Sequence, residues 1–189
     1  MRTETVTRTL YQFSELSDEA KRRAIEKLYD INTNYDWWDC TYDTIKTAGA
    51  CVGIDCRVEG FDLDRGAHVA LSGKYTYQKN WRTALRAEFG GDTLAELERI
   101  GAWLQDAQKC LFWSGYASME SSRYGTRYSA DADHGGQHDV DGLVDGLREF
   151  EHWALTLLRE EYGYLTSNEV IRETIEANEY EFDEAGNLA

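Results

Sequence analysis

The side chains best suited to chemistry lie in one short segment, His134-Gly-Gly-Gln-His138-Asp139, which follows Asp131 and Asp133. Two imidazoles and a carboxylate form a ligand set that zinc and other transition ions accept. The segment is rich in glycine and has no glutamate beside its first histidine, unlike the helical motif of metalloproteases. We therefore interpret it as a solvated loop and keep a metal-dependent enzyme centred on His134, His138 and Asp139 as the weaker alternative.

Other catalytic patterns are weak or absent in the sequence. The segment Phe61-Asp-Leu-Asp-Arg-Gly66 resembles the start of a calcium loop, but no glutamate closes it near Ser72, which favours a charged turn. There is no nucleophile elbow, no dinucleotide fingerprint and no phosphate-binding loop. Acidic pairs such as Glu160-Glu161 arise readily in a chain with this many carboxylates. We predict a protein that is not an enzyme and uses no cofactor.

Adjacent tryptophans, Trp37 and Trp38, offer a different kind of site. Neighbouring residues of a helix point about 100° apart, so one ring can enter the core while the other lies near the surface. Asp36, Asp39 and Asp43 lie close by in the sequence. A tryptophan among carboxylates suits a protein-binding hot spot, whereas burial of both rings in the core is the alternative.

Carboxylates are the most abundant charged groups, with 35 Asp and Glu against 20 Lys and Arg, a net charge of −15. They occur in runs, each of which is most simply a solvated face. Together the runs can imitate the spaced negative charge of a DNA backbone. The predicted partner-binding residues are Asp36, Trp37, Trp38, Asp39, Asp43, Asp62, Asp64, Asp131, Asp133, Asp139, Asp141, Glu173, Glu176 and Glu179.

Hydrophobic periodicity and capping patterns predict the elements that must position these residues. Thr93-x-x-Glu96 and Thr166-x-x-Glu169 are typical capping boxes, and Gly60 marks a β-bulge where the strand changes phase. The expected elements are a strand over 3–13, a helix from Ser17 to about residue 31, a helix over 34–48, a hairpin of 54–63 with 69–77, a helix over 92–112, a strand over 120–129, a loop over 130–138, a helix over 140–162 and a helix from Thr166.

This order predicts the α+β class, because strands and helices do not alternate as in a βαβ series. We expect an antiparallel sheet of about four strands with about five helices packed against it. The length of 189 residues suits a single domain over 1–189, with a short C-terminal hairpin over 180–188.

Composition bounds the setting in which the protein works. Hydrophobic residues make up 42% and aromatic residues 13% of the chain, which suits a folded body rather than a disordered acidic segment. No apolar run reaches the length of about 18 residues that spans a membrane, and Met1-Arg2-Thr3-Glu4 lacks the apolar region expected of a secretion signal. We expect a cytoplasmic protein whose four cysteines, Cys40, Cys51, Cys56 and Cys110, are reduced and packed.

Several segments resemble a family of small acidic proteins encoded by phages and prophages, sometimes labelled antitoxin-like. The resembling segments are 13–25, 30–32, 35–39, 61–66, 162–169 and 177–182. The resemblance implies a phage accessory gene that acts in the bacterial cytoplasm, and it brings no catalytic residues.

Charge and resemblance together lead to the functional hypothesis. A polyanion is repelled by this chain, so direct binding to nucleic acid or to an anionic membrane is not expected. We predict a bacteriophage protein that binds a protein with a basic groove and antagonises host defence, for example a CRISPR or restriction nuclease, by mimicking DNA. The first alternative is an antitoxin-like neutraliser of a toxin, and the second is the metal-dependent enzyme described above.

Overall fold

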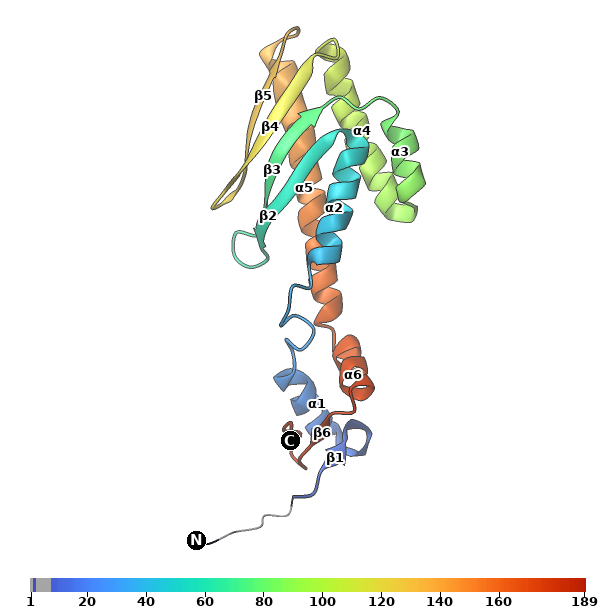
Figure 1. Cartoon of the computed structure of the whole chain (residues 1–189), viewed down its shortest axis with the longest axis vertical. Helices are drawn as coiled ribbons and strands as arrows, with labels where there is room; N and C mark the ends of the chain where they lie inside the picture. The colour runs from blue at the N-terminus through green and yellow to red at the C-terminus, as the bar shows by residue number, and fades with distance from the viewer. Residues whose placement is uncertain (1, 3–7) are drawn as a thin grey trace. The chain divides into compact units, whose positions relative to one another are not determined.

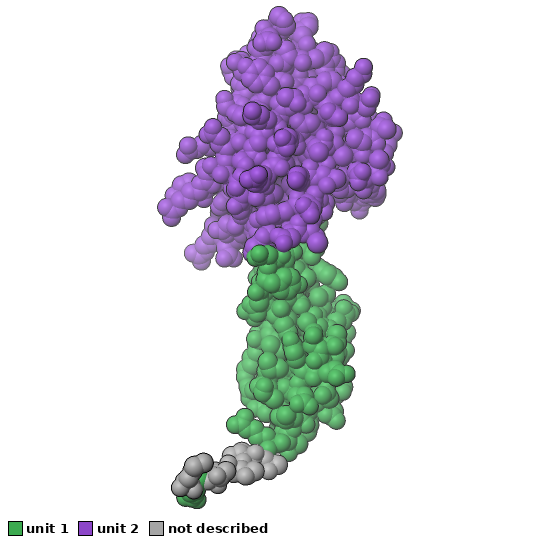
Figure 2. Space-filling view, viewed as in Figure 1, with its two compact units in different colours: residues 1–37, 160–189 green, residues 38–159 purple. Residues whose placement is uncertain are grey.

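The computed structural model describes Arg2 and residues 8–189. Its contacts divide the chain into two compact units, residues 1–37 with 160–189 (unit 1) and residues 38–159 (unit 2) (Figure 2). Both units include part of the long helix α5 (Gln137–Leu165). The α+β class is confirmed, and the prediction of one domain over 1–189 stays a prediction.

Unit 2 is built on an antiparallel sheet in the order β2-β3-β4-β5 (Figure 1). The strands are β2 (Ile54–Asp62), β3 (His68–Thr76), β4 (Gly115–Ser122) and β5 (Gly125–Ala132). The predicted hairpin is confirmed, since Ile54 pairs with Tyr75 and Asp62 with His68. The register shifts between Val58 and Gly60, which confirms the predicted bulge.

Helices cover one face of this sheet. They are α2 (Asp39–Val52), α4 (Gly91–Cys110) and most of α5, while α3 (Trp81–Glu88) packs against α2 and α4 (Figure 1). The side chains beneath them are buried and belong to alternate strand positions: Ile54, Cys56, Val69, Leu71, Tyr75, Ala117 and Met119. Most of the intervening positions are polar and exposed or half-buried, apart from buried Ala70, so the opposite face of the sheet is open to solvent.

Four predictions were wrong in position. The helix predicted over 34–48 is α2, which begins only at Asp39, so Trp37 and Trp38 precede it. The single strand predicted over 120–129 is instead the end of β4, a turn and most of β5, and the chain reverses where Gly125 adopts a φ of 121°. The capping box at Thr93 does not form, because α4 already begins at Gly91. Helix α5 begins at Gln137, so His138 and Asp139 lie in its first turn rather than in a loop.

Unit 1 joins the two ends of the described chain. Its elements are β1 (Tyr11–Gln12), a short 3-10 helix (Phe13–Glu15), α1 (Asp18–Lys27), the last turns of α5, α6 (Asn168–Ala177) and β6 (Glu181–Phe182). Strand β1 pairs with β6 in antiparallel fashion. The core consists of Phe13, Leu16, Ala20, Ala24, Ile171, Ile175 and Phe182.

The signals at the helix starts of unit 1 can be checked directly. Ser17 caps α1 as predicted, since its hydroxyl accepts a hydrogen bond from the Ala20 N–H. Helix α6 is capped by Ser167 rather than Thr166, so the predicted start was one residue early. At the C-terminus Phe182 pairs with Leu188 across a tight turn. Of the strand predicted over 3–13, residues 3–7 lie outside the described residues.

The cysteines divide into two classes. Cys51 and Cys56 are buried, as expected, but Cys40 and Cys110 are exposed at the start of α2 and the end of α4. The expectation of four packed thiols was therefore wrong for these two, since both occupy the solvent-facing side of their helices. None of the described helices combines the length and apolar character needed to cross a bilayer.

Candidate protein-binding surfaces

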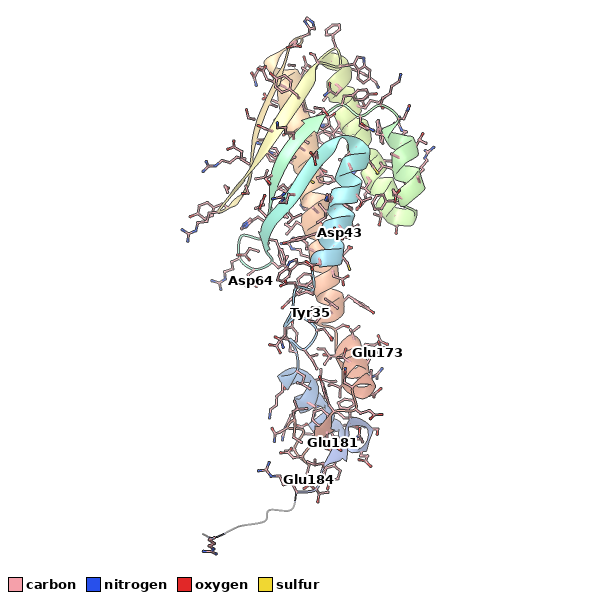
Figure 3. The ribbon with its side chains drawn as sticks, in the orientation of Figure 1. Tyr35, Asp43, Asp64, Glu173, Glu181 and Glu184 are labelled. Carbon is pink, nitrogen blue, oxygen red and sulfur yellow. The ribbon has the colours of Figure 1, made fainter. Side chains whose placement is uncertain are left out.

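One group of predicted acids lies at the β2–β3 turn end of the sheet in unit 2. We call Asp39, Asp43, Asp62 and Asp64 the turn-end acids; all four are exposed (Figure 3). The first turn of α2 reaches this end because the ring of Trp38 packs 5.5 Å from that of Phe61 on β2.

Trp37 and Trp38 mainly make contacts inside the protein and expose little surface to a partner. Trp37 is 8% exposed, and its ring lies 5.7 Å from that of Tyr162 within unit 1. Trp38 is half-buried between Tyr42 and Phe61 in unit 2. The structure therefore brings Asp39 and Asp43 beside a half-buried tryptophan, while Trp37 has little surface to offer a partner.

A second group of acids lies at the opposite end of the sheet. Asp131 is near the end of β5, Asp133 follows it, and Asp139 and Asp141 are in the first turns of α5. The Asp139 carboxylate accepts a hydrogen bond from the Gly136 N–H at 3.0 Å, and so stabilises the start of the helix. Asp131 and Asp133 remain exposed.

The weaker alternative of a metal centre finds no support at this end. Among the residues that the structure describes, no group of three or more His, Cys, Asp or Glu side chains is arranged to hold a metal ion. The His134 N–H donates to the Ser114 hydroxyl, and its ring packs 6.2 Å from that of Phe112. His134 therefore has neighbours that explain its position without a metal.

A third group occupies the C-terminal segment of unit 1. Residues 160–189 contain nine Asp and Glu and a single basic residue, Arg172. We call the exposed glutamates on and after α6 the C-terminal acids (Figure 3): Glu169, Glu173, Glu176, Glu179, Glu181 and Glu184. Asp183 is engaged locally, since hydrogen bonds from Asn187 and Ala185 hold its pKa below the usual range.

The ion pairs of the described chain leave all three groups untouched. The carboxylates that pair with Lys or Arg are Glu19, Glu98, Asp106, Asp145 and Glu149. No residue of the predicted partner-binding set is among them within the described residues. These carboxylates therefore keep a negative charge that the chain's own cations do not offset by direct contact.

Unit 2 also has a group of exposed aromatic residues that the sequence did not predict. It lies at the same end of the sheet as Asp131 and consists of Tyr77, Phe112, Trp113 and Tyr116, which we call the aromatic edge. Phe112 is 71% exposed, Trp113 46% and Tyr116 49%. The Tyr77 and Trp113 rings lie 4.5 Å apart. The one sequence signal was Phe-Trp directly after the last apolar residue of a helical repeat, where neither ring continues the buried stripe.

Tyr116 connects the aromatic edge with the second acidic group. Its hydroxyl lies 3.4 Å from an Asp131 carboxylate oxygen. The negative charge of Asp131, joined by that of Asp133, raises the pKa of Tyr116 above its ordinary value. The phenol therefore stays protonated at neutral pH and donates its hydrogen to Asp131.

No known family model, curated protein or solved structure matches this chain. The arrangement of its own side chains is thus the basis for assigning a function.

Proposed function

We propose that this protein acts by binding another protein, as a phage-encoded stoichiometric inhibitor of a host defence protein that binds nucleic acid. Its exposed carboxylates would occupy the basic groove in place of phosphates. The observation that carries the proposal is that none of the predicted partner-binding carboxylates is ion-paired to the chain's own Lys or Arg within the described residues.

Unpaired carboxylates on a rigid support are suited to this task. Long-range attraction between an acidic surface and a basic groove speeds association and favours that class of partner over others. The same arrangement repels nucleic acid itself, because phosphate contacts require Lys and Arg. The charge is most one-sided in residues 160–189, where nine acids face one arginine.

The spacing of the C-terminal acids supports the comparison with a polyanion. Glu169, Glu173 and Glu176 are four and three residues apart on α6 and therefore share one side of that helix. At a rise of about 1.5 Å per residue they place three charges along roughly 10 Å of axis. A DNA strand carries one phosphate per about 3.4 Å, so the linear density is of the same order.

The test is capture from bacterial lysate followed by a functional assay. Immobilised protein is exposed to nuclease-treated lysate, and bound proteins are eluted with increasing salt and identified. The recovered protein is then titrated with DNA in the presence and absence of the acidic protein. We expect it to bind nucleic acid, to elute at moderate salt and to lose DNA binding at a stoichiometric ratio.

Two matched triple variants distinguish the effect of where the acids lie from the effect of the net charge. Glu173→Gln/Glu176→Gln/Glu179→Gln removes three unpaired acids, whereas Glu98→Gln/Asp106→Asn/Asp145→Asn removes three acids that are ion-paired. Both change the net charge equally, and the proposal predicts a larger loss of inhibition for the first. Capture that is indifferent to salt, or a captured protein that does not bind nucleic acid, would contradict it.

A further inference from the structure

We infer that the aromatic edge, together with Asp131 and Asp133, binds an arginine side chain of the protein partner. This inference rests on the proposed function, because it names the chemical group that a basic groove would present to this end of unit 2. In this inference the partner is recognised by exposed aromatic rings as well as by negative charge. The sequence alone did not point to these rings.

The register of the sheet brings these side chains to one place. Tyr116 at the start of β4 pairs with Thr76 at the end of β3 on one side and with Asp131 of β5 on the other. Tyr77 follows β3 directly, and its ring contacts that of Trp113. Three strand ends and the loop after α4 therefore meet at the aromatic edge.

The backbone that carries Phe112 and Trp113 is unusual. Both residues have positive φ angles, 52° and 63°, in the left-handed region that bulky residues rarely adopt. Two consecutive aromatic residues in this conformation require firm support from their surroundings. The aromatic side chains are consequently held out toward solvent instead of folding onto the core.

Gln108 supplies that support from the last turns of α4. Its side chain is fully buried; Nε2 donates to the Gly115 carbonyl at 2.6 Å, and Oε1 accepts from the Gly115 N–H at 3.1 Å. Its own carbonyl accepts a hydrogen bond from the Trp113 N–H at 2.8 Å. The exposed rings are thus presented by a pre-organised loop, which lowers the entropic cost of binding.

An open hollow of about 410 Å³ adjoins the aromatic edge on the helix-free face of the sheet. Tyr116 and Asp131 line it together with the hydroxyl-bearing residues Thr76, Ser118 and Ser129. Lys74 also lines it, and its cross-strand neighbour in the sheet is Asp55. The hollow therefore combines the exposed ring of Tyr116, the Asp131 carboxylate and neutral hydrogen-bonding groups, with Lys74 at its border.

Arginine fits this combination better than other side chains. Its planar guanidinium stacks on aromatic faces and donates two parallel hydrogen bonds to a carboxylate. Lysine carries a compact point charge and cannot make both contacts in one plane. An apolar neighbour of the arginine would cover Phe112 and Trp113. A second copy of this chain is the poorer occupant, because each copy has a net charge of −15.

The test uses two capped peptides, Leu-Arg-Leu and Leu-Lys-Leu, titrated into the full-length protein. Binding is followed by ¹H–¹⁵N spectra, in which the Trp113 indole is a direct reporter. We expect the arginine peptide to bind about 2- to 5-fold more tightly than the lysine peptide, the range expected for an exposed aromatic–cation contact. The Trp113 indole should shift with the first peptide and much less with the second.

Variants of the protein then show which residues cause the preference for the arginine peptide. Phe112→Asn/Trp113→Asn/Tyr116→Thr should abolish it, and asparagine is chosen because it adopts the left-handed conformation readily. Tyr116→Leu alone, on a solvent-facing strand position, gives a second variant should the triple variant not fold. Glu173→Gln/Glu176→Gln/Glu179→Gln, which changes unit 1 alone, should keep the ratio between the peptides.

Equal affinity for both peptides, or a preference that survives in Tyr116→Leu, would overturn the inference. So would self-association of the protein that disappears in the Tyr116→Leu variant, because a second copy would then be the occupant. The two proposals fail separately. Loss of the arginine preference leaves salt-dependent capture intact, whereas failure to capture a nucleic-acid-binding protein leaves the peptide ratio unchanged.

Discussion

A single amide, the side chain of Gln108, links the core of unit 2 to the loop that carries Phe112 and Trp113. It is fully buried and hydrogen-bonds Gly115 through both of its polar atoms. It also hydrogen-bonds Tyr75, which partly offsets the rise that burial causes in the Tyr75 pKa. At the scale of one residue, the fold depends on polar groups being paired wherever they are enclosed.

Replacing this amide should therefore weaken both stability and loop order. We expect Gln108→Ala to lower the free energy of unfolding by about 2–4 kcal/mol, because it leaves the Gly115 N–H and C=O without partners in the core. Amide hydrogen exchange over 111–115 should accelerate as well. The control is Gln105→Ala on the same helix, where an exposed contact with Arg82 is lost and the change should stay within about 0.5 kcal/mol. Equal effects of the two substitutions would contradict this role.

Tyr75 predicts a specific weakness at alkaline pH. Its ordinary pKa is 10.0, and burial raises it to about 12 in the folded protein. Below pH 10 the tyrosine is neutral in both states, and its contribution to stability is complete. Between pH 10 and about 12 the unfolded chain ionises first, so stability falls by about 1 kcal/mol per pH unit from this group.

Urea unfolding at pH 8, 9, 10 and 11 measures this loss. Tyr75→Phe should unfold more easily than the unaltered protein at pH 8, because it loses the hydrogen bond to Gln108, yet its stability should fall less steeply above pH 10. Parallel curves for the two proteins would show that Tyr75 does not ionise on unfolding in this range.

At the scale of elements, α3 and α4 meet at a close contact. A Cβ atom added to Gly101 of α4 would lie 2.5 Å from the ring of Trp81 of α3. Glycine inside a helix ordinarily costs stability, so alanine would normally be an improvement. Here the Trp81 indole occupies the space that a Cβ atom would need. The close packing of α3 on α4 therefore requires glycine at position 101.

Opposite outcomes are therefore expected for two glycine substitutions in unit 2. Gly101→Ala should lower the free energy of unfolding by about 1–3 kcal/mol, the usual range for overpacking. Gly142→Ala on α5, whose added Cβ would lie an ordinary 4.0 Å from Ala107, should raise it by up to about 1 kcal/mol. Chemical denaturation of both variants checks the pair. Stabilisation by Gly101→Ala would mean that Trp81 moves aside at little cost.

The elements also show what sequence patterns can predict. The β2–β3 hairpin and α4 follow directly from periodicity, because each has one buried face along its whole length. The β4–β5 hairpin was missed because Ser121-Ser-Arg-Tyr-Gly125 lacks an apolar alternation, and its reversal depends on the backbone of one glycine. Helix α3 was missed because eight residues are too few for a clear repeat.

The candidate surfaces divide in the same way. Exposure of the turn-end and C-terminal acids followed from their charge alone, since ionised groups stay in water. The aromatic edge could not be predicted, because aromatic side chains are usually buried and only the left-handed backbone of Phe112 and Trp113 turns them outward. The sequence could not show which acids lack ion pairs either, because this depends on where the arginines and lysines lie in three dimensions.

At the scale of the whole molecule, each unit has its own core. Unit 2 spans residues 38–159 without interruption, whereas unit 1 is assembled from 1–37 and 160–189. We therefore expect a fragment of residues 38–159 to fold alone, with cooperative thermal unfolding by circular dichroism and the tertiary near-ultraviolet signal of its aromatic core. A fragment of residues 1–37 should be unstructured, since its buried face consists of Phe13, Leu16, Ala20 and Ala24 with no partner.

Limited proteolysis of a 1–159 fragment is the control for this division. Cleavage should be confined to residues 1–37, leaving a resistant piece that begins near Trp38. A fragment 38–159 that fails to fold, or a 1–159 fragment that is degraded throughout, would show that the two units form one cooperative body.

The pairing of β1 with β6 determines when unit 1 can fold during synthesis. Tyr11 is translated before any residue of unit 2, but its strand partner Phe182 is translated only after all of unit 2. Unit 2 has its complete sequence available well before then, and domains generally fold as units while the chain grows. The first apolar residues of unit 1 therefore stay exposed until residues 160–189 have been translated. A premature stop before residue 160 would release a chain with a finished sheet and an orphaned amino-terminal helix, open to proteases and chaperones.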